Sequence, residues 1–214
     1  MCFDQSSSLA AFSIGLASAY AAFVYGYTVL SVLLFIVALM QLSEFLIWRG
    51  IDNHDVSQNR AGTALARTTL GLHAFAVCIA AFVFALPTQQ WRRYGLVVCT
   101  ILSIVMYGLI VDTPYGLTTY AGCASGCRLK WTFPKHIYGY EIIFMIVFVA
   151  LLLSKIHALQ TLCIFIFYTL TFAGAIATSK PGHLWEAIST SWCYASSFGS
   201  PLLVATLVGL NIPT

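Results

Sequence analysis

Long apolar segments, separated by shorter polar ones, make up most of this chain. A membrane-spanning helix needs about 20 mostly apolar residues, and seven segments approach that length. We expect helices at 9–26, 28–48, 62–86, 94–111, 137–154, 161–179 and 185–209. The pattern predicts an all-α integral membrane protein, in which residues 1–214 form a single bundle of seven transmembrane helices.

The composition supports this assignment. Of the 214 residues, 60% are hydrophobic and 8% are charged, whereas soluble proteins carry about 25% charged residues. The net charge is +3 and there is no run of Lys or Arg, so we expect the lipid bilayer as a partner and no nucleic acid. The N-terminus lacks the basic region of a signal peptide, and we expect residues 1–214 to be the mature chain. The sequence does not specify the oligomeric state and is compatible with a homo-oligomer.

The second expected helix carries a carboxylate inside its apolar segment. Gln41, Glu44 and Trp48 are spaced i, i+3 and i+7, so they share one helical face. An ionisable group costs roughly 2.5–3.5 kcal/mol near the centre of a membrane helix and usually faces the bundle interior. Glu44 lies about one turn from the helix end, with Trp48 as an interfacial aromatic residue. We expect other polar groups to converge on this face.

All seven acidic residues lie on one side of the expected bundle. With seven spans, the N-terminus and the second, fourth and sixth loops share that side. The acidic residues there, or in helices just inside it, are Asp4, Glu44, Asp52, Asp55, Asp112, Glu141 and Glu186. The other side has only Arg92, Arg93 and Lys155. This asymmetry predicts a polar cavity that opens to one side of the membrane.

The cavity would combine carboxylates with deeper metal-binding or proton-relaying groups. Imidazole, carboxylate and thiolate groups bind transition metals, and imidazole also relays protons. The expected cation pocket consists of Gln41, Glu44, His73, Glu141 and Glu186. Cys193 lies deeper in the last helix, on a polar stripe that continues to Ser197 and Ser200. Pro201 should kink that helix and free a carbonyl group near the stripe.

Two simpler interpretations compete with the cation pocket. Glu44 and Arg67 would form a structural ion pair if their helices face each other. His73 by itself would more often be a hydrogen-bonded core histidine than a ligand.

The cysteines bear on orientation. Cys123 and Cys127 lie in a glycine-containing loop, where a disulfide is expected; a metal pair is the second choice, because no further Cys/His pair follows at zinc spacing. A disulfide needs an oxidising compartment, which favours an exoplasmic acidic side and N-terminus. The count of Lys and Arg, seven on the acidic side against three, favours the reverse. Cys78, Cys99 and Cys163 lie in apolar helices and are expected to pack as small hydrophobic residues.

Several short motifs resemble a family of small multi-pass membrane proteins. The matching segments are Met1-Cys2-Phe3, Gln41 with Glu44, His73, the cysteine loop before Lys130-Trp131-Thr132-Phe133-Pro134, and Trp192-Cys193. Members begin Met-Cys-(Trp/Phe)-Ser, occur in bacteria, eukaryotes and large DNA viruses, and have no assigned function. Asp4 stands where the family pattern has serine, so a role for that hydroxyl does not carry over. The resemblance implies a shared fold and a shared site at Cys2, Glu44, His73, Trp131 and Cys193.

Three functions follow from these patterns. The first is binding or conduction of a small cation, a metal ion or a proton, by the pocket. The second is a membrane enzyme with a transition metal or haem held by Cys2, His73 and Cys193. The third is a structural or interaction subunit whose polar residues lock the bundle. No G-x-S-x-G or H-E-x-x-H motif is present, so nucleophilic and zinc-peptidase chemistry have no distinctive signature.

Overall fold

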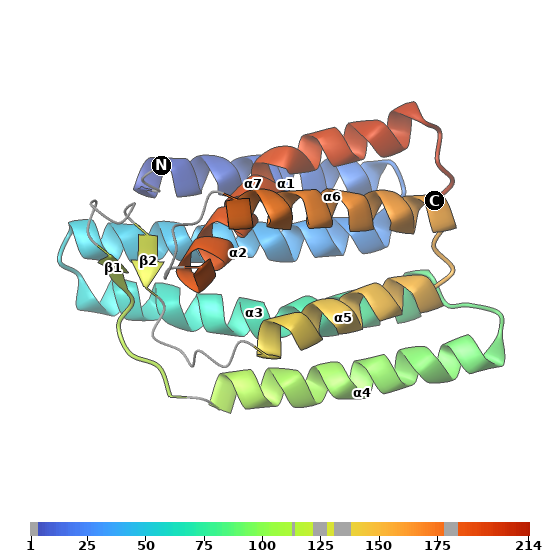
Figure 1. Cartoon of the computed structure of the whole chain (residues 1–214), viewed down its shortest axis with the longest axis horizontal. Helices are drawn as coiled ribbons and strands as arrows, with labels where there is room; N and C mark the ends of the chain where they lie inside the picture. Colours follow the sequence, from blue (N-terminus) through green and yellow to red (C-terminus); the bar gives the residue numbers. More distant parts are fainter. Residues whose placement is uncertain (1–3, 113, 122–127, 131–137, 178–183) are drawn as a thin grey trace.

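The computed structural model describes residues 4–112, 114–121, 128–130, 138–177 and 184–214; for 120, 121, 128, 130, 138–141 and 184–194 it describes the backbone alone. The described chain contains seven helices and a two-stranded hairpin (Figure 1). They are α1 (Gln5–Val24), α2 (Thr28–Asp52), α3 (Val56–Phe84), α4 (Gln90–Asp112), β1 (Thr119–Ala121), β2 (Arg128–Lys130), α5 (Tyr138–Leu153), α6 (Ala158–Ala177) and α7 (Leu184–Gly209). The expected all-helical fold is confirmed, and α1, α2, α3, α4 and α6 are long and apolar enough to cross a membrane.

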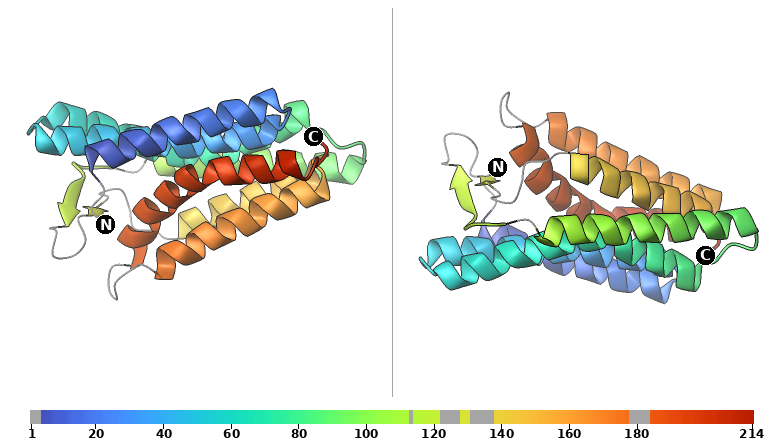
Figure 2. Two further views of the ribbon diagram at one scale, coloured as in Figure 1. Left: turned by 90° about the horizontal axis from the view of Figure 1, so that it is seen from above. Right: turned by 90° about the horizontal axis from the view of Figure 1, so that it is seen from below.

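The helices lie side by side in an elongated bundle. The N-terminus, the α2–α3 turn and the hairpin lie at one end, and the C-terminus lies at the other (Figure 1). α2 packs against both α1 and α3, and α7 lies between α1 and α6 (Figure 2). α4 lies at the edge of the bundle, where it contacts α3 and α5. Because α2 has neighbours on several sides, it is the helix best able to bury polar side chains.

The turn between α2 and α3 is much shorter than the polar segment 49–61 suggests. α2 continues to Asp52 and α3 already begins at Val56. Asp55 caps α3: its Oδ1 accepts hydrogen bonds from the backbone N–H groups of Ser57 (2.9 Å) and Gln58 (3.0 Å). The expected boundaries were wrong here because hydropathy marks where apolar residues stop, whereas capping decides where a helix stops.

The hairpin was not expected from the sequence. β1 and β2 pair antiparallel, with Tyr120 opposite Leu129. Leu129 is fully buried in a small cluster with Ile47 and Trp48 of α2. Trp48 therefore lies beneath the hairpin instead of forming an exposed interfacial residue.

α7 changes direction along its length (Figure 1). Pro201 lies inside this helix and has no N–H to donate to the carbonyl of Ser197, four residues earlier. The hydroxyl of Ser200 donates to that carbonyl instead, at 2.7 Å. The carbonyl group that Pro201 frees is therefore satisfied within α7.

Tyr27, in the α1–α2 turn, fastens the end of α7. Its hydroxyl is within hydrogen-bond distance of two carbonyl oxygens, those of Leu207 (3.1 Å) and Ile212 (2.8 Å). Burial raises the pKa of Tyr27 above its usual 10.0. The neutral, donating phenol is thus the form that the folded state favours.

We expect Tyr27→Phe to lower the free energy of unfolding by about 1 kcal/mol at neutral pH, since buried acceptors lose their donor. The folded state holds the phenol proton more tightly than the unfolded state, so this contribution is complete below pH 10 and is lost as the pH rises further. Thermal unfolding in detergent should therefore show the wild-type advantage narrowing above pH 10. Tyr20→Phe is the control, because Tyr20 is 70% exposed; an equal loss there would contradict the assignment.

Candidate functional site

Glu44 and Gln41 lie in the interior of the bundle. Both side chains are fully buried, with 0% exposure. The amide nitrogen Nε2 of Gln41 donates to Oε2 of Glu44 at 3.4 Å, a long and therefore weak hydrogen bond. The remaining oxygens, Glu44 Oε1 and Gln41 Oε1, have no hydrogen-bond partner among the described residues. The shared face predicted for these two residues is confirmed to be an inward one.

His73 is buried on α3 in a defined orientation. Its Nδ1 lies 2.9 Å from the carbonyl oxygen of Thr69, and the ring meets Phe144 of α5 edge-on, with centroids 6.5 Å apart. A carbonyl group only accepts hydrogen bonds, so Nδ1 carries the proton and Nε2 of the neutral ring keeps a lone pair. Nε2 is buried without a partner in the described part of the chain, as is the hydroxyl of Thr69.

α7 adds a buried hydroxyl group, that of Ser197, close to α1 and α2. A Cβ atom placed on Gly15 of α1 would lie 3.0 Å from Cβ of Ala38 and 3.4 Å from Oγ of Ser197. The three helices α1, α2 and α7 therefore meet closely here. Ser197 is 1% exposed, and its Oγ has no partner among the residues that the structure describes. Ala38 precedes Gln41 by one helical turn.

Five of the side chains that have a buried polar atom without a described partner lie on α2, α3 and α7, and we refer to them as the polar column: Glu44, Gln41, Ser197, Thr69 and His73. Their depths follow from the rise of about 1.5 Å per residue, counted from the α2–α3 turn. Glu44 lies about 12 Å deep, Gln41 about 17 Å, Thr69 about 20 Å and His73 about 26 Å. Four of the five thus lie at increasing depth from the acidic end, and successive depths differ by about 3 to 6 Å along the bundle axis.

The hairpin and its preceding segment close the outer end of the column. Thr118, just before β1, is held to α3 by hydrogen bonds that join distant parts of the chain. Asn59 Nδ2 donates to its carbonyl (2.8 Å), its N–H donates to Asn59 Oδ1 (3.0 Å), and its hydroxyl lies 2.8 Å from that of Thr63. Leu129 then packs over Trp48, one turn from Glu44.

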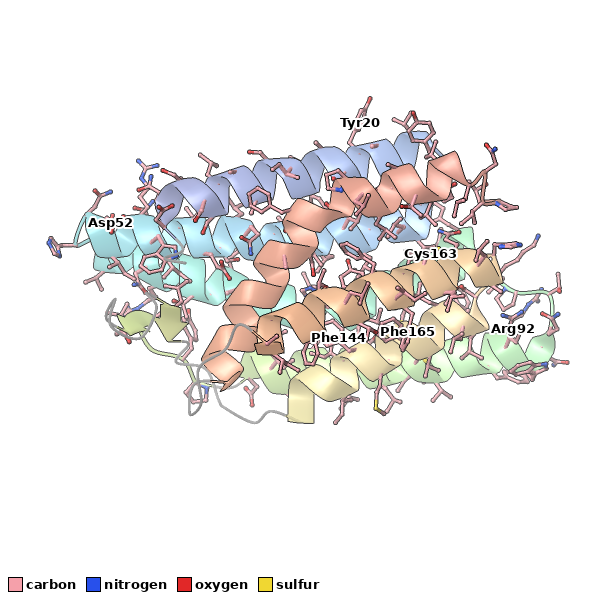
Figure 3. All side chains as sticks on the ribbon, turned by 45° about the horizontal axis from the view of Figure 1, so that its top comes forward. Tyr20, Asp52, Arg92, Phe144, Cys163 and Phe165 are labelled. Atoms are coloured by element: carbon pink, nitrogen blue, oxygen red, sulfur yellow. The ribbon has the colours of Figure 1, made fainter. Side chains whose placement is uncertain are left out.

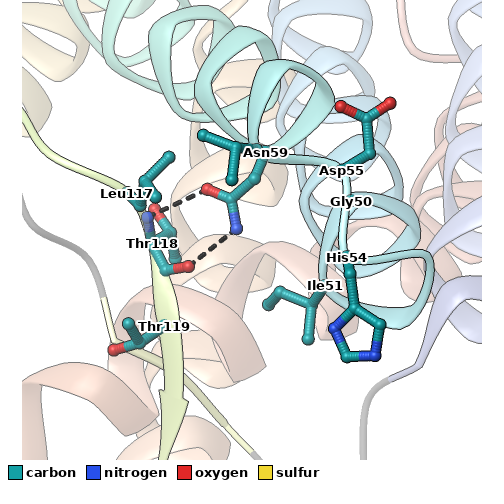
Figure 4. Close-up of a pocket in the computed structure, with 9 residues that line it drawn as sticks. Gly50, Ile51, His54, Asp55, Asn59, Leu117, Thr118 and Thr119 are labelled. Carbon is teal, nitrogen blue, oxygen red and sulfur yellow. Dashed lines mark hydrogen bonds between the residues drawn. The ribbon is translucent and has the colours of Figure 1, made fainter.

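An open pocket of about 400 Å³ lies beside this closure (Figure 4). Gly50, His54, Asn59 and Thr118 are among the residues that line it. His54 adopts a positive φ of 53° in the α2–α3 turn. The pocket therefore gives water access to the end of α2, and Glu44 lies about two turns further along that helix.

We expect Asn59→Ala to loosen this closure. The substitution removes both hydrogen bonds between the Asn59 side chain and the Thr118 backbone, and leaves a buried N–H and C=O unsatisfied, a cost of about 1–3 kcal/mol. Hydrogen exchange at the Thr118 amide should accelerate on the order of tenfold or more. Asn53→Ala, in the exposed turn, is the matched control and should leave that amide unchanged. Unchanged exchange in Asn59→Ala would show that Thr118 is held by other contacts.

The structure does not bring Glu44 and Arg67 together as an ion pair. The hydrogen bond from Gln41 is the polar contact found for Glu44 among the described side chains. The guanidinium carbon of Arg67 instead lies 4.1 Å from the ring centroid of Tyr115, a cation–π contact. The difference arises from helix rotation, which the sequence does not specify.

The remaining predicted site residues cannot be placed at this site. For Glu141, Glu186 and Cys193 the structure gives the backbone position alone. Glu141 lies near the beginning of α5, Glu186 lies near the beginning of α7, and Cys193 lies about one-third along α7. Cys2, Cys123, Cys127 and Trp131 lie outside the described residues. Within the described part of the chain, no group of three or more His, Cys, Asp or Glu could hold a metal ion. The expected metal, haem and disulfide sites therefore stay predictions.

Sequence reasoning missed Thr69 and Asn59. Thr69 precedes His73 by four residues, so helical spacing alone would have placed both on one face. Asn59 offered no such signal, because its partner Thr118 is 59 residues away.

No family model, curated protein or solved structure matches this chain. The resemblance to the Met-Cys-(Trp/Phe)-Ser family stays a prediction.

Proposed function

We propose that this protein is a multi-pass membrane protein that takes up protons at Glu44 and passes them along the polar column. The observation that carries the proposal is the chemistry of the atoms without described partners. Glu44 Oε1, Gln41 Oε1 and His73 Nε2 all present lone pairs. Buried acceptors call for a donor or a positive charge, so the column suits a proton or another small cation.

A purely structural role fits these atoms less well. Polar groups that lock a bundle are expected to satisfy one another, because each buried group left unsatisfied costs about 1–3 kcal/mol. Five buried side chains with an unsatisfied atom are thus a burden on stability, of the kind that proteins retain at functional sites.

Among small cations, the proton is the better supported. A bound metal ion needs several converging ligands, and the described residues contain no such group. A proton needs one titratable acceptor at a time, with hydroxyl groups or water between them. Glu44 and His73 differ in depth by about 14 Å, so transfer between them requires water. In this arrangement Glu44 and His73 accept protons, and Gln41, Thr69 and Ser197 orient the intervening water.

The test is proton flux in liposomes that contain the purified chain and a pH-sensitive dye in the lumen. A potassium gradient with a potassium ionophore supplies the driving potential. The proposal predicts that acidification is faster than in protein-free liposomes and also faster than in liposomes containing an unrelated helical membrane protein. Equal rates in all three would overturn the proposal.

A further inference from the structure

The end of the bundle opposite the hairpin carries a compact basic surface. Arg92 and Arg93 lie in the first turn of α4, and Lys155 lies in the turn between α5 and α6. Asp52 and Arg92 mark the two opposite ends in Figure 3. Backbone carbonyl groups hold these two turns together, and this fixes the cations relative to one another.

The hydrogen bonds are specific. Nη2 of Arg92 donates to the carbonyls of Leu152 (2.6 Å) and Ser154 (2.8 Å), at the end of α5. Nε of Arg93 donates to the carbonyl of Pro87 (2.7 Å), and the N–H of Lys155 donates to the carbonyl of Ala85 (2.7 Å). Arg92 thus contacts Ser154, the residue before Lys155. These hydrogen bonds join the two turns, so the three cationic residues lie on one surface.

No described acidic residue balances this charge. The acidic residues whose side chains are described lie at or near the other end of the bundle: Asp4, Glu44, Asp52, Asp55 and Asp112. Arg93 and Lys155 are exposed. The surface therefore attracts an anion.

Aromatic and aliphatic side chains continue directly from the basic surface. Trp91 is 66% exposed and Tyr94 is 62% exposed, and both residue types favour the headgroup level of a bilayer. The following turns of α4 expose Val97, Val98 and Ile101. An anion binding here would therefore meet aromatic rings and then an aliphatic helix face.

We propose that this surface binds an anionic phospholipid of the surrounding leaflet, with its phosphate at Arg93 and Lys155 and an acyl chain along the exposed face of α4. A free anion would contact the cationic side chains alone and leave the aromatic and aliphatic face of α4 uncovered. A lipid would contact the cationic side chains with its headgroup and the face of α4 with its acyl chain. Anionic lipids are enriched in the cytoplasmic leaflet, which agrees with the expected exoplasmic acidic end. The inference does not depend on proton transfer by the polar column.

The experiment is native mass spectrometry of the full-length chain in detergent, mixed with phosphatidylglycerol or phosphatidylcholine of identical acyl chains. We expect the wild type to retain phosphatidylglycerol about tenfold more than phosphatidylcholine. The double variant R93Q/K155Q should lose most of this preference. Arg92 is left unchanged, because it holds the end of α5.

The matched control is R49Q/R60Q, which removes two exposed arginines from the opposite end of the bundle. It should keep the preference, and circular dichroism should show that both variants are folded. Equal retention of the two lipids by the wild type, or an equal loss in both variants, would overturn the proposal. Displacement of phosphatidylglycerol by inorganic phosphate would also overturn it, because the surface would then be a site for a free anion.

Discussion

Glu44→Gln should reduce proton flux through liposomes containing the protein to the rate of protein-free liposomes. Glutamine has nearly the same shape and leaves the face shared with Gln41 intact, but its amide does not exchange a proton at physiological pH. Loss of a proton-transferring side chain typically costs a factor of about 100 to 10,000 in rate. The flux in excess of the protein-free rate should therefore fall on the order of 100-fold, measured with the same luminal dye and driving potential.

The control for this substitution is Asp52→Asn. Asp52 is an exposed acid at the same end of the bundle, so its loss changes the surface charge and leaves the buried column intact. Flux should stay near the wild-type rate. Unaltered flux in Glu44→Gln would rule out Glu44 as the proton acceptor. A drop in thermal stability with unchanged flux would indicate that Glu44 serves the fold alone.

The helical fold could be predicted because it follows from hydropathy. Seven segments were long and apolar enough to be recognised, and the described residues form seven helices. The ends of α2 and α3 were not predictable in the same way. Arg49 and Asp52 at the end of α2 and Gln58 to Arg60 at the start of α3 are polar, yet they are helical, since Asp55 supplies the cap between the two helices. A hydropathy pattern detects the lipid-compatible part of a helix and not its polar extension.

The candidate site was predictable only within single helices. The spacing of Gln41 and Glu44 placed both on one face, and that face is buried. Contacts between helices depend on rotation and on long-range pairing, which the sequence does not state. For this reason Arg67 contacts Tyr115 instead of Glu44, and Trp48 lies under Leu129 instead of at an interface. The depth of His73 could be predicted from the helix rise per residue. Its ring orientation could not, because the hydrogen bond to the Thr69 carbonyl sets it.

The close approach of α2 and α3 determines whether the outer end of the polar column stays closed. Gly50 of α2 faces the backbone of Asn59 on α3, the residue that holds Thr118. A Cβ atom at Gly50 would lie 2.5 Å from the nitrogen of Asn59 and 2.9 Å from its Cα. Neither atom belongs to a side chain that can rotate away. A side chain at position 50 must therefore push the two helices apart.

Gly50→Ala should consequently lower the free energy of unfolding by about 3 kcal/mol, the upper part of the range for overpacking, as measured by unfolding in detergent mixtures. It should also displace Asn59 and so accelerate hydrogen exchange at the Thr118 amide. Gly108→Ala is the matched control, since a Cβ atom there meets nothing within 4 Å; its stability should change by less than about 1 kcal/mol. If both variants lose equal stability, the loss is not specific to the contact between α2 and α3, since replacing Gly by Ala would by itself favour the helix. If Gly50→Ala alone is destabilised while Glu44-dependent proton flux rises, the α2–α3 contact restrains access to the column.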